Sequence, residues 1–189
     1  MAIEIEIKLH LQDGVAARER LEGIGYTVRH PRVLEADQLY DRADGELEAS
    51  SRALRLRSAG GVWTLTYKGP PDDGPYKSRE EIELGVEDGR AMQQVLFALG
   101  YYATFRYEKY RTVFTCDGEP GVVMLDETPM GDFLELEGPG DWIDRTTAKL
   151  GFLTKDYVLS TYPKLYEGYQ KKHPRLPRNM VFLKADETS

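Results

Sequence analysis

Pairs of like-charged residues separated by a single position recur along this sequence. They are Glu4/Glu6, Arg55/Arg57, Glu81/Glu83, Lys109/Arg111 and Glu135/Glu137. On a β-strand, residues two positions apart point to the same face and their Cα atoms lie about 7 Å apart. Each pair therefore predicts a block of one charge on one face of a strand.

The acidic and the basic pairs favour different ligands. Carboxylate oxygens are hard ligands that suit Mg²⁺ or Mn²⁺. Guanidinium and ammonium groups suit the oxygens of phosphate. A site that contains both predicts a polyphosphate held by a basic wall and joined through metal ions to an acidic wall. Attack by water on a terminal phosphoryl group would then need no covalent nucleophile.

The charged pairs belong to segments in which apolar and polar residues alternate, as in β-strands. In residues 3–9 the three isoleucines and Leu9 share one face, while Glu4, Glu6 and Lys8 share the other. Such a strand ordinarily turns its apolar face inward and its charged face to water. The blocks of like charge favour the reverse arrangement, a closed barrel with a charged interior. Because isolated buried charges are costly, that interior predicts a water-filled site for a charged ligand.

Two amphipathic helices are expected between the strands. Asp13 can cap a helix that ends at Gly25, and Asp88 can cap a second that ends at Gly100. A third short helix is predicted over residues 144–150, and the segment 157–166 is ambiguous, with Pro163 at a suitable helix start. A weak repeat with an offset of 75 residues places Glu6 on Glu81 and indicates two related halves.

Composition narrows the class of protein. The chain has 189 residues, a net charge of −7 and one cysteine. These figures argue against nucleic acid or an anionic membrane as partner, and against a disulfide framework. No apolar run approaches the ~20 residues of a membrane span, and the first residues do not read as a secretory signal. P-loop and nucleophile-elbow motifs are absent. A cytoplasmic location is therefore expected.

The ordered series of charged motifs resembles the CYTH superfamily, also called triphosphate tunnel metalloenzymes. The resemblance begins with Glu4-Ile5-Glu6-Ile7-Lys8 and extends over residues 1–168. It leaves residues 169–189 as a basic, proline-containing C-terminal extension. The further matching segments are Asp37-Gln38-Leu39-Tyr40-Asp41, Leu54-Arg55-Leu56-Arg57, Trp63 to Gly69, Arg79 to Glu83, Lys109 to Arg111, Leu125-Asp126, and Gly131 to Gly138.

The resemblance implies an α+β fold, in which an eight-stranded antiparallel β tunnel has helices packed outside. It also implies a triphosphate and Mg²⁺ or Mn²⁺ in the lumen. Arg106 has the opposite strand parity to Lys109 and is left out of the site. The implied metal ligands are Glu4, Glu6, Glu81, Glu83, Asp126, Glu135 and Glu137. The implied substrate-binding residues are Arg55, Arg57, Lys68, Lys109 and Arg111. The expected catalytic residues are Glu4, Glu6, Lys8, Lys68 and Arg79.

Three activities are consistent with this resemblance. The first is a metal-dependent triphosphatase acting on inorganic triphosphate, thiamine triphosphate or a nucleoside triphosphate. The second is a class IV adenylate cyclase; the His-Phe pair typical of that class is not found before Glu4, which favours hydrolysis. The third is a non-catalytic polyphosphate sensor, which would not need so many carboxylates. The expected partner is a triphosphate-containing small molecule, and a homodimer stays open.

The C-terminal extension has two interpretations. Its lysines, arginines and prolines are typical of a flexible tail. Its apolar run over residues 180–183 could instead dock on the domain or on a second subunit. The sequence leaves both interpretations open.

Overall fold

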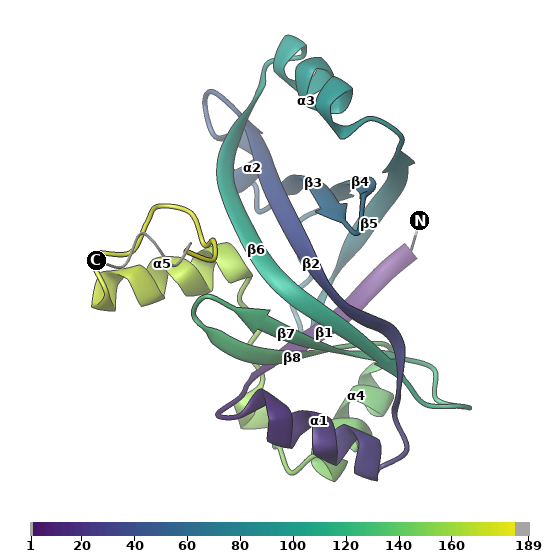
Figure 1. The fold of residues 1–189 in the computed structure, drawn as a ribbon. Coiled ribbons are helices and arrows are strands. Elements are labelled where there is room, and N and C mark those ends of the chain that lie inside the picture. Colours follow the sequence, from purple (N-terminus) through teal and green to yellow (C-terminus); the bar gives the residue numbers. More distant parts are fainter. Residues whose placement is uncertain (1, 184–189) are drawn as a thin grey trace.

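The computed structural model describes the backbone of residues 2–183 and the side chains of residues 5–183. Within this part of the chain, eight antiparallel strands close into a barrel in the order β1-β5-β4-β3-β2-β6-β7-β8 (Figure 1). The predicted fold class is confirmed. The strands are β1 (Ala2–His10), β2 (Thr27–Arg42), β3 (Ala53–Ala59), β4 (Val62–Lys68), β5 (Lys77–Val86), β6 (Tyr101–Thr115), β7 (Val122–Thr128) and β8 (Gly131–Glu137).

Five α-helices and one 3₁₀ turn accompany the strands in the described residues. The carboxylate of Asp13 accepts hydrogen bonds from the first N–H groups of α1, and Asp88 does the same for α3, as predicted. The third predicted helix starts at Gly140 rather than Asp144, and Pro163 lies in the first turn of α5. The elements are α1 (Gly14–Gly23), α2 (Glu46–Ala49), α3 (Gly89–Ala98), α4 (Gly140–Lys149), the turn Thr154–Asp156 and α5 (Tyr162–Lys172).

The main apolar core lies outside the barrel. Outward-facing residues of β1, β6, β7 and β8 pack against α1 and α4, which lie side by side in Figure 1. Trp142 of α4 and Leu21 of α1 are fully buried there, against strand residues such as Ile7 and Leu136. Burying these side chains contributes about 1.5–3 kcal/mol each. The helices thus cover the apolar outer faces of the strands, and the opposite faces of the strands form the lumen.

Two smaller apolar clusters cover other parts of the barrel. Leu96 of α3 packs with Leu56 and Tyr40 on the outside of the barrel. Tyr162 and Tyr166 of α5 pack with residues of β6 and β8. Among the described residues, no helix has the length and apolar character needed to cross a membrane.

The chain connectivity repeats, in agreement with the weak internal repeat of the sequence. If β1 to β4 are exchanged with β5 to β8, the barrel order maps onto itself. Strands β1 and β5 pair with each other, as do β2 and β6. Helix α1 follows β1 as α3 follows β5. The barrel therefore consists of two βαβββ halves in a two-fold arrangement.

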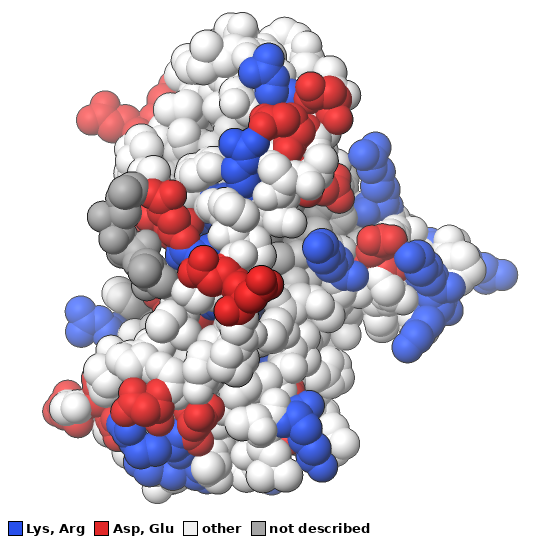
Figure 2. Space-filling view, turned by 180° about the vertical axis from the view of Figure 1, so that it is seen from behind, with Lys and Arg blue, Asp and Glu red and all other residues white. Residues whose placement is uncertain are grey.

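The segment after α5 packs on the barrel as far as the structure describes it. Met180 is fully buried and pairs with Tyr107 of β6. Of the two interpretations of the extension, docking on the same chain is therefore the one observed through Leu183. Basic side chains gather on the projecting α5 and on the segment after it (Figure 2). The basic side chains of the described part of the extension thus lie on the surface; they are Lys171, Lys172, Arg175 and Arg178.

Candidate functional site

Charged side chains line the inside of the barrel, in a cavity of about 1240 Å³. Directly paired residues of antiparallel strands point to the same side, so the register collects the charged faces of all eight strands. The predicted charged interior is confirmed. The charged lumen residues at most 9% exposed are Glu6, Lys8, Glu35, Asp37, Lys68, Lys77, Arg79, Lys109, Arg111, Asp126 and Glu135.

Asp126 lies between two cations, which together form the Asp126 triad (Asp126, Lys109, Arg111). Its carboxylate accepts from Arg111 through two hydrogen bonds of 2.6 Å and from Lys109 Nζ at 2.8 Å. The Tyr162 hydroxyl donates a further bond of 2.7 Å to Asp126 Oδ2. Because Asp126 is fully buried, these donors replace the water that its charge would otherwise need.

A second carboxylate occupies the same kind of position, in the Asp37 triad (Asp37, Arg55, Arg57). Arg57 Nε donates to Asp37 Oδ1 at 2.8 Å, and Arg55 Nε lies 3.4 Å from the same oxygen. Asp37 is also fully buried. Burial raises the pKa of Asp37, but the charges of the two arginines outweigh it and the net pKa is lowered. Asp37 therefore keeps its negative charge.

Lys8 joins two carboxylates from neighbouring strands. Its Nζ lies 3.2 Å from Glu6 Oε1 and 3.3 Å from Glu135 Oε1. Burial alone would lower the pKa of Lys8, but Glu135 and Glu6 raise it overall. Lys77 also contacts Glu6, yet burial and the adjacent charge of Lys8 lower the pKa of Lys77 to about 8. Glu6 and Glu135 thus meet at one cationic centre.

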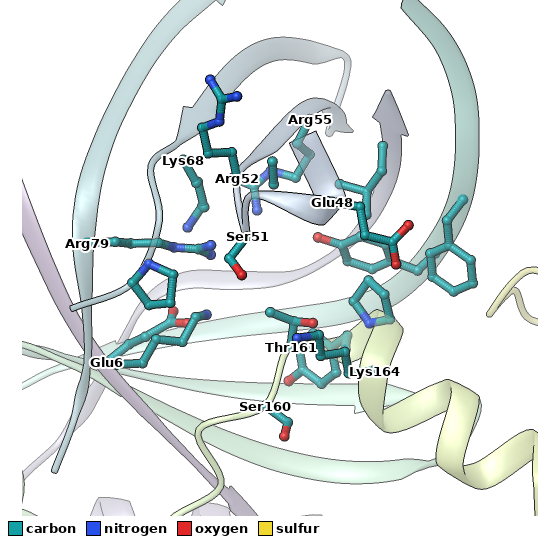
Figure 3. A pocket seen from close by; sticks show the side chains of 18 of the residues that line it. Glu6, Glu48, Ser51, Arg52, Arg55, Lys68, Arg79, Ser160, Thr161 and Lys164 are labelled. Carbon is teal, nitrogen blue, oxygen red and sulfur yellow. The ribbon is translucent and has the colours of Figure 1, made fainter. Parts of the chain in front are cut away.

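Arg79 differs from the other lumen cations. Among the described carboxylates, none forms an ion pair with it, and its buried Nε has no hydrogen-bond partner. Its side chain points into the cavity beside Lys68 and Glu6 (Figure 3). Arg79 therefore adds a buried positive charge to the cavity wall.

The remaining predicted residues lie along the same wall. Lys68 Nζ is 2.6 Å from Glu81 Oε2, and Glu137 also borders the cavity. The Glu83 side chain is 55% exposed, so it lies where the cavity meets solvent. Glu4 pairs with Arg79 through the backbone of β1 and β5, but its side chain lies outside the described residues.

The barrel therefore brings together the predicted site residues whose side chains are described. The side chain of Glu4 is not among them. The side chain of Arg106 is half exposed and pairs with Glu108 outside the lumen, as its strand parity predicted. The assignment of each lumen residue to metal, substrate or catalysis stays a prediction.

Sequence reasoning missed several lumen residues. Glu35 and Asp37 form a further acidic pair with a spacing of two, and the missed Lys77 forms a further basic pair with the predicted Arg79. The rule that found the other pairs would have found these. Tyr162 could not be found in this way, because it enters the lumen from α5 rather than from a strand.

The lumen carboxylates are of a type that binds divalent cations, but in this structure they pair with lysine and arginine side chains. Among the described residues, no three acidic, histidine or cysteine side chains converge on a common metal position. Glu6 and Glu135 nevertheless direct oxygens at one cationic centre, now Lys8 Nζ. Paired carboxylate oxygens are the ligands that Mg²⁺ and Mn²⁺ prefer. Glu6 and Glu135 therefore fit a divalent metal ion that would replace the ammonium group of Lys8 between them.

The chain belongs to the CYTH family, whose domain model matches residues 2–155. Enzymes of this family act on triphosphate substrates such as ATP and in general depend on divalent metals. A protein of Methanocaldococcus jannaschii, named provisionally as an adenylate cyclase, is 33% identical over 135 residues. That alignment covers 71% of this chain and 76% of the relative.

Solved structures show the same fold. A provisional adenylate cyclase from Vibrio parahaemolyticus has a TM-score of 0.77 and 20% identity, covering 87% of this chain and 98% of its own. An adenylyl cyclase homologue from Hippeastrum, described as having a dominant triphosphatase activity, has a TM-score of 0.62 and 19% identity. That match covers 94% of this chain and 98% of the Hippeastrum chain.

Proposed function

We propose that this protein is a divalent-metal-dependent triphosphatase that hydrolyses inorganic triphosphate, thiamine triphosphate or a nucleoside triphosphate. The observation that carries the proposal is the set of cations that line the cavity, among them Arg79, Lys68 and Lys77. The Arg79 side chain is buried and points into the cavity (Figure 3). Several phosphate oxygens would accept hydrogen bonds from these cations.

The two triads give the basic wall a defined geometry. Asp37 holds Arg55 and Arg57, and Asp126 holds Lys109 and Arg111, at fixed positions around the lumen. A triphosphate in the cavity would meet cations that are already held at the lumen and need only turn from carboxylate to phosphate, so less side-chain entropy is lost on binding. These cations would also stabilise negative charge that develops on the phosphoryl group during its transfer.

The acidic wall is the proposed metal site. Glu6 and Glu135, together with Glu4 and Glu137, would hold Mg²⁺ or Mn²⁺, and Glu81, Glu83 and Asp126 complete the carboxylates assigned to this role. When bound, the metal would supply charge neutralisation and activation of water. Lys8 would be released from Glu6 and Glu135 and would join the basic wall. Hydrolysis is favoured because these groups can bind and polarise a triphosphate without a side-chain nucleophile.

Product analysis tests the reaction. The protein is incubated with inorganic triphosphate, thiamine triphosphate or ATP, each with Mg²⁺ or Mn²⁺, and phosphate, pyrophosphate and cyclic AMP are measured. Phosphate release that a chelator abolishes is the expected result. Cyclic AMP with pyrophosphate would instead establish a cyclase. Tight metal-dependent binding without any product would establish a sensor.

The cyclase is the second candidate because the M. jannaschii relative is named as one. The Hippeastrum homologue is also named a cyclase, yet its dominant activity is described as that of a triphosphatase. The Hippeastrum homologue therefore supports hydrolysis as the first reaction to test.

Glu135→Gln tests the acidic wall. The amide keeps the shape of the side chain but loses the charge, so we expect metal-dependent turnover to be abolished while the circular dichroism spectrum is retained. Metal affinity, measured by calorimetry with Mn²⁺ alone, should also fall. Glu22→Gln, on the exposed surface of α1, is the matched control and should keep both properties. Near-normal turnover in Glu135→Gln would contradict the assignment.

A further inference from the structure

The segment after α5, residues 173–183, forms an ordered strap along β6. The N–H of Glu108 donates to Met180 O at 2.7 Å, and Met180 N–H donates to Arg106 O at 3.1 Å. Asn179 Oδ1 accepts from the N–H of Arg106 at 3.0 Å. Strand β7 pairs with β6 only from Tyr110 onward, so the strap covers an edge of β6 that β7 leaves open.

The strap also holds α5. The Tyr166 hydroxyl donates to Pro177 O at 2.9 Å, and Gln170 Nε2 donates to the same oxygen. Leu176 packs beside the buried cluster that contains Met180, Tyr162 and Tyr166. Helix α5 also packs directly on the strands through ring contacts of Tyr162 and Tyr166, so the strap and the strands together fix its position against β6.

The first turn of α5 reaches the deepest charges of the lumen. Tyr162 is 4% exposed, and its hydroxyl donates to Asp126 Oδ2, the oxygen that also accepts from Lys109 and Arg111. The ring lies 4.9 Å from Lys109 Nζ and 5.3 Å from Lys8 Nζ, within the range of cation–π attraction. A displacement of α5 would therefore change the surroundings of three charged groups.

We propose that the strap makes Tyr162 a positioning residue for triphosphate binding: its hydroxyl shares the charge of Asp126, so that Lys109 and Arg111 can turn toward phosphate. This inference rests on the proposed function, because it concerns the same ligand. Without the phenol, the fully buried Asp126 would depend on the two cations alone. Ligand binding would then have to compete with a stronger ion pair.

Two substitutions in the full-length protein test the inference. Tyr162→Phe keeps the ring and removes the hydroxyl. Met180→Ala loosens the strap at its buried anchor, and Leu183→Ala, at an exposed position of the strap, is the matched control. Affinity for inorganic triphosphate is measured by calorimetry with a chelator present, and KM and kcat are measured with Mg²⁺.

We expect Tyr162→Phe and Met180→Ala each to weaken triphosphate binding by about tenfold, the effect of one hydrogen bond to a charged group. KM should rise by a similar factor with a smaller change in kcat. The double variant should be little weaker than either single variant, because both act through one contact. Met180→Leu should restore affinity, and Leu183→Ala should leave it unchanged.

Three results would overturn the inference. They are unchanged affinity in a folded Tyr162→Phe protein, a Met180→Ala protein that loses thermal stability but binds normally, and losses that multiply fully in the double variant. Wild-type binding without hydrolysis, with the same order of affinities among the variants, would contradict the proposed reaction and still support the role of the strap.

Discussion

The Asp37 triad and the Asp126 triad occupy equivalent places in the two halves of the barrel. Asp37 of β2 pairs in register with Arg57 of β3, and Arg111 of β6 pairs in register with Asp126 of β7. The exchange of the two halves places β2 on β6 and β3 on β7. The two pairs therefore join equivalent strands, with the sign of each charge reversed.

The two triads differ in solvent access at one cation. The side chains of Arg55, Arg57 and Arg111 are 12%, 15% and 11% exposed, whereas that of Lys109 is 2% exposed. Water can solvate the first triad when its arginines turn to a ligand. In the second triad Lys109 lacks that access to water, and the hydroxyl of Tyr162 donates to its partner Asp126. On the proposed role of Tyr162, a buried ion cluster stays available to a ligand because a neutral donor shares its charge.

The largest expected effect is the loss of a central carboxylate. Asp126→Asn leaves Lys109 and Arg111 without their main counter-charge, so we expect the free energy of unfolding to fall by about 3–5 kcal/mol. Asp37→Asn should cost less, because neither of its two cations is as deeply buried as Lys109. Urea denaturation monitored by fluorescence measures both, with the exposed Asp141→Asn as control. An equal or larger loss in Asp37→Asn would contradict the contrast.

An intermediate effect is expected on ligand binding. Arg55→Ala removes one cation of the more accessible triad, and we expect the half-saturation concentration for triphosphate to rise about tenfold or more. The unfolding free energy should change less than in Asp126→Asn. Steady-state kinetics measure the change, with Arg18→Ala on the surface of α1 as the matched control. A large loss of kcat at constant half-saturation would argue against a binding role for Arg55.

The smallest effect concerns alkaline pH, where a tyrosine outside both triads contributes. Burial and the adjacent carboxylate of Asp144 raise the pKa of Tyr157 to about 12, from about 10 in an unfolded chain. The neutral phenol therefore stabilises the fold fully below pH 10, and this contribution is lost as the pH rises from 10 to 12. Tyr157→Phe should reduce the slope of stability against pH in that window. An unchanged slope would mean that the loss of stability at alkaline pH comes from other groups, including the lumen tyrosines.

Much of the lumen could be predicted from local sequence. Arg55 and Arg57, or Lys109 and Arg111, share a strand face because side-chain direction alternates with every residue. Glu35 and Asp37 obey the same rule, because residues 33–39 of β2 pair with β6 in continuous register between the shifts near 28–33 and 39–40.

The partners of these residues could not be predicted in the same way. Lys77 meets Glu6 across 71 positions of sequence, and Tyr162 meets Asp126 across 36. Such pairs depend on strand register and on where a helix docks. The path of residues 173–183 is likewise a matter of tertiary contact, since its basic and apolar residues suit both a free tail and a docked one.

The sequence by itself therefore determined which residues are strand-borne, which strand faces carry charge and which helices begin at Asp13 and Asp88. These properties depend on short-range geometry: the two-residue period of a strand and the capping of a helix. Only the tertiary structure decided that the charged faces meet inside a closed barrel, that Arg79 is left without a partner among the described carboxylates, and that α5 brings Tyr162 to Asp126. Those outcomes depend on barrel closure and on packing between distant segments, which no local pattern of residues encodes.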